Sequence, residues 1–172
     1  MMKGFAPLYI LVPVIIAGIF GTLYLTNFPL TEVSGEKIGF ADFINFLLFQ
    51  FPPNVPEADY KSNQEISGWF STINGSEAGQ SLGAIKSLGN TIKVCVFNES
   101  SYCDVFKIES GKIYETSDAP QRTIYVSYQF ALELKQRAET GNYEGLDRRM
   151  VQAIKSGDIK GIMINDVLNM NK

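Results

Sequence analysis

The first part of the chain is an unbroken run of hydrophobic positions. No residue from Phe5 to Leu25 is charged, and a helix that crosses the apolar core of a bilayer needs about 20 apolar residues. Tyr9 and Tyr24 lie near the two ends of this run, where aromatic rings favour the membrane interface. The pattern predicts a retained transmembrane anchor within residues 1–28. The alternative is a cleaved signal peptide, but its apolar region is normally shorter and precedes a small-residue cleavage site that this chain lacks.

Charges around the run indicate an orientation. Lys3 precedes it, and Lys37 is the first basic residue after it. The positive-inside rule favours a single-pass protein of the cell membrane with its N-terminus in the cytoplasm and its folded domain on the outer side. The glycosylation sequons at Asn74 and Asn98 agree with this orientation, because they matter only outside.

A second apolar segment, rich in phenylalanine, follows between Phe40 and Phe51. It is too short to span a bilayer, and Pro52-Pro53 ends it. It is either the first helix of the folded domain or an amphipathic helix in the membrane interface. We favour a helix that contacts the domain and also lipid or a partner protein. It belongs to a helical and loop connector over residues 29–89.

From Asn90 onward the hydrophobic period changes to two. Ile92, Val94 and Val96 alternate with other residues as in a half-buried strand, and Asn98-Glu99-Ser100 predicts a turn. Strands are also expected over residues 102–108, 112–115, 122–127 and 158–164.

The return strand of this hairpin defines a register. With the turn centred on Glu99, Phe97 faces Ser101, Val96 faces Tyr102, and Cys95 faces Cys103. Directly opposed residues of an antiparallel pair lie close enough for a disulfide when the pair is not hydrogen-bonded. The alternative is two buried thiols of a reducing cytoplasm. We expect the disulfide, and with it an oxidising compartment.

Helical spacing follows the strands. Ser127 is a suitable N-cap, and Phe130, Ala131, Leu134 and Ala138 fall on one side of a helix. A second helix is expected around Met150, and a short closing helix over 166–170. Strands followed by helices indicate an α+β domain over residues 90–172, with an antiparallel sheet covered by helices.

Several segments of this domain resemble the sterol carrier protein family, of the type-two, lipid-transfer kind. They are the turn Glu109-Ser110-Gly111-Lys112, the strand and helix cap Thr123-Ile124-Tyr125-Val126-Ser127, the two helices, and the strand entry Gly157-Asp158-Ile159-Lys160-Gly161. The resemblance covers about half of the chain. It implies a twisted sheet covered by helices, with a lipid held between the two layers by apolar shape.

The resemblance supplies candidate lipid-lining residues and no catalytic residues. For each of them, ordinary core packing is the competing interpretation. The candidates are Phe106, Ile124, Val126, Phe130, Leu134, Met150, Ile154 and Met163.

Composition argues against several function classes. The chain has no histidine, which removes the commonest general base and metal ligand, and two cysteines are too few for a cysteine-only zinc site. The formal net charge is −3, with a pI of about 5.0, and no basic cluster favours nucleic acid. We therefore expect no catalytic residue, metal site or cofactor.

Two functions remain from the sequence. One is a non-catalytic accessory or structural subunit of a larger membrane complex, favoured by the small residues Ala17 and Gly21 on the anchor, which let another helix approach. The other is a tethered lipid-binding domain that holds an isoprenoid or acyl chain. The expected partners are the bilayer, other membrane subunits and a bound lipid.

Overall fold

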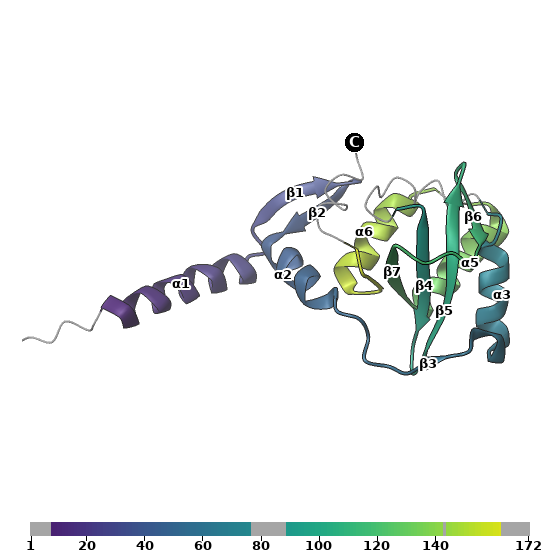
Figure 1. The fold of residues 1–172 in the computed structure, drawn as a ribbon. Helices are drawn as coiled ribbons and strands as arrows, with labels where there is room; N and C mark the ends of the chain where they lie inside the picture. The colour runs from purple at the N-terminus through teal and green to yellow at the C-terminus, as the bar shows by residue number, and fades with distance from the viewer. Residues whose placement is uncertain (1–7, 77–88, 143, 163–172) are drawn as a thin grey trace, which may run out of the picture.

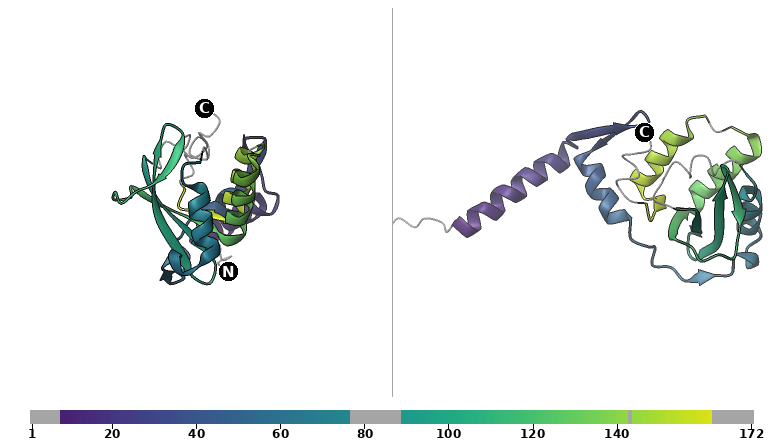
Figure 2. Two further views of the ribbon diagram at one scale, coloured as in Figure 1. Left: turned by 90° about the vertical axis from the view of Figure 1, so that its right-hand side faces the viewer. Right: turned by 45° about the horizontal axis from the view of Figure 1, so that its top comes forward.

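The computed structural model describes residues 8–76, 89–142 and 144–162 (Figure 1). Helix α1 (Leu8–Leu25) projects away from the rest of the protein, as Figures 1 and 2 both show. A hairpin of β1 (Pro29–Val33) and β2 (Glu36–Gly39) leads into α2 (Phe40–Phe49). Among the described residues, no helix combines the length and hydrophobicity needed to cross a membrane. The predicted helix in the phenylalanine-rich segment is confirmed as α2.

The central sheet has the order β3-β5-β4-β7-β8, and β6 also pairs with β5. Its strands are β3 (Glu57–Ala58), β4 (Thr91–Phe97), β5 (Ser101–Glu109), β6 (Lys112–Glu115), β7 (Arg122–Ser127) and β8 (Ile159–Lys160). The helices of this region are the 3₁₀ helix η1 (Tyr60–Ser62), α3 (Gln64–Ile73), α5 (Tyr128–Thr140) and α6 (Leu146–Ser156). The predicted α+β class is confirmed.

The expectation of an antiparallel sheet is wrong for two pairs, because β4 runs parallel to β7 and β3 runs parallel to β5. After β6 the chain passes to the other side of β4 before it enters β7. There the Gln121 N–H donates to the Thr91 carbonyl (2.9 Å), and the Gln121 side-chain oxygen accepts from the Asn90 N–H (2.7 Å). These bonds place the start of β7 beside the start of β4, so that the two strands run in the same direction.

The predicted hairpin register is confirmed residue by residue. Phe97 pairs with Ser101, Val96 with Tyr102, and Cys95 with Cys103. The two cysteines form a disulfide. The expected pairing therefore holds, and it fastens the two central strands to each other near their turn.

Helices α3, α5 and α6 cover one face of the sheet, as the left view of Figure 2 shows. The side chains of Ile92, Val94 and Val96 point into this layer and are buried together with Phe106. The same cluster includes side chains from the predicted connector, namely Val33, Ile38, Phe46, Ile66, Trp69, Phe70 and Ile73. Segments within residues 29–89 thus share one core with the β4–α6 region.

The ends of α5 and α6 follow the expected chemistry. The Ser127 hydroxyl accepts from the Phe130 N–H (3.3 Å) at the start of α5, which confirms the predicted N-cap. Gly157 ends α6 with a φ of +80°, a conformation that glycine adopts without steric cost. The expected closing helix over 166–170 lies outside the described residues, as does the end of the strand predicted over 158–164.

Candidate functional site

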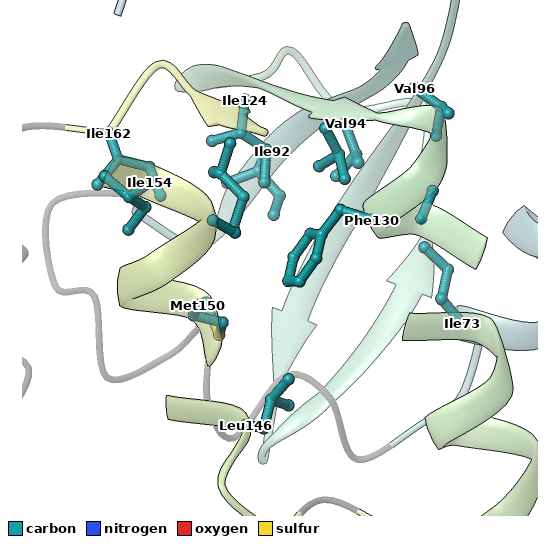
Figure 3. Close-up of a cluster of buried hydrophobic side chains, with 14 of the residues drawn as sticks. Ile73, Ile92, Val94, Val96, Ile124, Phe130, Leu146, Met150, Ile154 and Ile162 are labelled. Atoms are coloured by element: carbon teal, nitrogen blue, oxygen red, sulfur yellow. The ribbon is translucent and has the colours of Figure 1, made fainter. Parts of the chain in front are cut away.

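An apolar cavity of about 70 Å³ lies between the sheet and its covering helices. Figure 3 shows several of its walls: Val94 and Ile124 from the sheet, Phe130 from α5, and Met150 from α6. The full lining comprises Trp69, Ile73, Val94, Ile113, Ile124, Val126, Phe130, Leu134, Arg137, Ala138, Leu146, Met150, Ile159 and Ile162. Only one of these residues is charged, so the cavity suits a nonpolar group.

Two periodicities in the sequence build these walls. On the sheet, Val94 pairs with Ile124 in the parallel register of β4 and β7, and Val126 lies two residues further along the same face. On the helices, residues spaced by four share a side: Phe130 and Leu134 on α5, and Leu146 and Met150 on α6. The cavity therefore lies between alternate residues of the strands and residues spaced by four on the helices.

Five of the eight predicted lining residues do border the cavity: Ile124, Val126, Phe130, Leu134 and Met150. Phe106 and Ile154 are buried in the surrounding core, with 0% and 1% exposure, but are not part of the lining. Met163 lies outside the described residues. The structure thus brings together the candidates from β7, α5 and the middle of α6.

The wall supplied by α3 was not predicted as part of the site. Trp69 and Ile73 lie four residues apart on this helix, and both are buried. The positions Ile66, Trp69, Phe70 and Ile73 follow the helical period, which was available evidence for an apolar helix face. The pairing of that face with α5 is long-range, and no local pattern reveals it.

One polar atom, the indole nitrogen of Trp69, is buried among these side chains. Within the part of the chain that the structure describes, this nitrogen has no hydrogen-bond partner, and it is inaccessible to solvent. An indole N–H normally finds an acceptor when it is buried. Trp69 is 3% exposed, and it is the single tryptophan of the chain, so its fluorescence reports on this region.

Arg137 forms the polar boundary of the cavity. Its Nε lies 3.2 Å from the Glu133 carboxylate, and its Nη1 donates to the Glu144 carbonyl (3.0 Å). Glu133 also pairs with Arg149 (2.8 Å), whose guanidinium lies 4.8 Å from the centre of the Phe130 ring. Arg137 additionally borders an open polar depression on the surface of α5, together with Glu133 and Glu144. An apolar interior thus adjoins a polar, charged rim.

The volume of the cavity limits the size of the ligand that it accepts in this conformation. An engineered cavity of about 150 Å³ binds benzene, and pockets for drug-sized ligands measure roughly 300–1,000 Å³. A cavity of about 70 Å³ therefore accepts a small apolar group or the end of a chain. A longer chain requires the helices to move away from the sheet.

A second cluster of polar groups lies at β5 and β6, where Asp104 pairs with the cavity-lining Val94. The Tyr60 hydroxyl donates to Glu115 (3.1 Å). Asp104, which points to the core side of the sheet, accepts from the Val105 N–H (2.8 Å) through one oxygen, and its other oxygen is buried. Burial raises the pKa of Asp104, and the nearby Glu115 carboxylate adds to this effect. Burial likewise raises the pKa of Tyr60 to about 12.

Within residues 8–76, 89–142 and 144–162, no group of three or more histidine, cysteine, aspartate or glutamate side chains is placed to hold a metal ion. The cavity between sheet and helices is therefore the candidate functional site. No protein-family model matches the chain, and no curated protein matches it either.

Proposed function

We propose that this protein is a membrane-anchored, non-catalytic lipid-binding domain. The observation that carries the proposal is the apolar cavity between the sheet and helices α3, α5 and α6. The resemblance to sterol carrier proteins implies a lipid between those two layers, and five of the residues expected to line it border the cavity. Binding by apolar shape also fits a chain without histidine.

The cavity suggests how an isoprenoid or acyl chain would bind. The end of the chain replaces the empty volume beside Phe130 and Met150, and methionine adapts to irregular shapes because its side chain is unbranched. The polar end of the lipid lies at the rim, where Arg137 borders both the cavity and the surface depression. A longer chain separates α5 and α6 from the sheet and exposes apolar surface that the lipid then covers.

The anchor is the second part of the proposal. The predicted anchor sequence, Phe5 to Leu25, contains no charged residue, and α1 begins within it at Leu8. Ile19 and Phe20 of α1 are about half exposed, as expected for side chains that contact lipid. The disulfide between Cys95 and Cys103 is typical of an oxidising compartment, which supports a domain on the outer side of the cell membrane.

Native mass spectrometry after extraction in a mild detergent tests the lipid-binding proposal. We expect one lipid per chain in a substantial fraction of the protein. Ala138→Leu, which places a larger side chain at the cavity wall, should lower that fraction. Leu132→Ala is the matched control, because Leu132 lies on the same helix and is 40% exposed. Protein that carries no lipid, or equal occupancy in all three proteins, would contradict the proposal.

An accessory subunit of a membrane complex is the second candidate function. The observation that favours it is the small surface at Ala17 and Gly21 on α1. A Cβ atom built on Gly21 meets no other atom within 4 Å, so a partner helix has room to approach there. Co-purification of defined membrane subunits, lost in a Gly21→Leu variant, would support this function.

A further inference from the structure

Five large apolar side chains are exposed around the junction between α1 and the folded domain. They are Phe28, Leu30, Leu47, Leu48 and Phe51, which we call the collar. Their exposed fractions run from 48% to 69%. Exposed apolar side chains that gather in one region of a protein mark interaction surfaces more often than single exposed residues do.

Two collar residues, Leu47 and Leu48, belong to α2, and the other side of this helix is fixed to the domain. Phe46 of α2 is buried in the core. Asp42 lies 3.3 Å from the Lys155 ammonium of α6, and the Gln50 side chain accepts from the Ile162 N–H (2.9 Å). Asp42, Phe46 and the C-cap residue Gln50, which are spaced by four, thus lie on the inner side of α2. Leu47 and Leu48 point outward.

The junction between α1 and α2 is also held by specific contacts. The Asn27 side chain accepts from the Ala41 N–H (2.9 Å) and donates to the Asp42 carboxylate (3.1 Å). Gly39 approaches Asn27 so closely that an added Cβ would lie 2.0 Å from its side-chain oxygen. The rings of Phe20 and Phe40 are in contact, with centroids 5.6 Å apart.

Charge reinforces this junction. Burial acts to raise the pKa of Asp42, but the Gly39 N–H, the Asn27 amide and the Lys155 charge together lower it. Asp42 is thereby kept ionised between the end of α1 and α6. The α1–α2 junction and the domain are consequently coupled through one carboxylate.

This geometry fixes where the collar lies relative to α1. In Figure 1 and in the right view of Figure 2, α2 turns steeply away from the axis of α1 directly after the short hairpin. The apolar surface of α1 ends at Leu25, which is 85% exposed, and Phe28 continues it. A bilayer crossed by α1 would therefore have its surface at the level of α2.

We propose that the collar docks on the bilayer surface and holds the domain against the membrane. This inference rests on the proposed anchor function of α1. The occupant is lipid rather than a protein, because the collar continues the apolar surface of α1 at the depth where the helix leaves the bilayer. Apolar side chains of an amphipathic helix insert into the boundary between head groups and acyl chains. The domain is then seated beside the lipid it binds, so that a chain transfers without passing through water.

Site-directed spin labels on the full-length protein in phosphatidylcholine vesicles test this docking. Both native cysteines are in the disulfide, so one introduced cysteine takes the label. Leu48→Cys and Phe51→Cys probe the collar, and Ile19→Cys probes α1. Leu132→Cys is the control, an exposed apolar position on α5 away from the collar. Collision rates with oxygen, which concentrates in lipid, are compared with those of a water-soluble nickel chelate.

We expect oxygen collisions to exceed nickel collisions several-fold at positions 19, 48 and 51, with the reverse at 132. Lipid exposure at 19 with water exposure at 48 and 51 would overturn the docking and leave the anchor intact. Water exposure at 19 would overturn the anchor itself. If position 48 is aqueous in these vesicles but protected in native membranes, a protein covers the collar, and the lipid proposal is refuted.

Discussion

Filling the cavity with a larger side chain tests the assignment of the site. Ala138 lines the cavity from α5. Ala138→Leu adds three carbon atoms, and burial of each contributes about 0.8 kcal/mol, or about 2 kcal/mol in total. The empty volume leads to a similar figure, because a void of about 70 Å³ costs about 2 kcal/mol at roughly 24 cal/mol per Å³. We expect the variant to unfold with up to about 2 kcal/mol more free energy than the wild type.

Ala131 provides a matched control on the same helix. It is 1% exposed but is not part of the cavity lining, so Ala131→Leu should overpack the core and destabilise by about 1–3 kcal/mol. Denaturant unfolding of the full chain in detergent, followed by Trp69 fluorescence, measures both. If Ala138→Leu destabilises the protein as much as Ala131→Leu, no space exists beside Ala138, and the site assignment fails.

Four further predictions concern the core, the disulfide, the buried carboxyl group and catalysis. Ile154→Asp places a carboxylate where the side chain is 1% exposed and should lower the free energy of unfolding by several kcal/mol. Leu134→Asp, at a half-buried position, should lower it by less. Thermal melts of the two variants that match the wild type would refute both expectations. Breaking the disulfide with Cys103→Ala should cost about 2–3 kcal/mol, and the denatured, unreduced wild type should show no free thiol on labelling. Because the pKa of Asp104 is raised, its ionised form is disfavoured in the folded protein, and stability is lost as the pH rises through that pKa. Asp104→Asn should therefore stabilise the protein at pH 7 but not at about pH 3, which is below the ordinary Asp pKa of about 3.9. Equal effects of the substitution at both pH values would contradict this. The pure chain should show no hydrolase or oxidoreductase turnover, and sustained activity in monomeric protein would refute a non-catalytic role.

Local patterns were enough to predict much of the fold. The β4–β5 register follows from a short turn and a period of two, because residues equally far from the turn must face each other. The ends of α5 and α6 follow from Ser127 and Gly157. The β1–β2 hairpin also carried a local signal that was missed: Ser34-Gly35, where both residues have positive φ (49° and 77°), as a tight hairpin turn requires.

Most features of the fold that the sequence did not predict depend on pairing between residues far apart in the chain. The two-residue strand β3 has too few positions to show a period, and nothing near Arg122 in the sequence indicates that β7 pairs in parallel with β4. Asp104 is a charged residue on the core side of its strand, where it pairs with the buried Val94. The structure places it near Tyr60 and Glu115, which come from two other elements.

The residues of the candidate site likewise fall into those that local patterns predict and those that only long-range packing brings together. Ile124, Val126 and Phe130 were predictable because they lie on the apolar faces of adjacent elements in one sequence segment. Trp69 and Ile73 reach the cavity only through the packing of α3 against the rest of the layer. Phe106 and Ile154 show the limit of such reasoning, since equally apolar positions are buried beside the site without lining it.

Quenching of Trp69 by brominated acyl chains tests the central claim most directly. Trp69 is the single tryptophan of the chain and borders the cavity. Titration of the full chain in detergent with a fatty acid brominated near its methyl end should quench the fluorescence saturably, at one acid per chain. Ala138→Leu should weaken the quenching, and Leu132→Ala should leave it unchanged. Trp69 emission that does not respond, or that falls only linearly with total bromide content in all three proteins, would contradict a lipid site between the sheet and its helices.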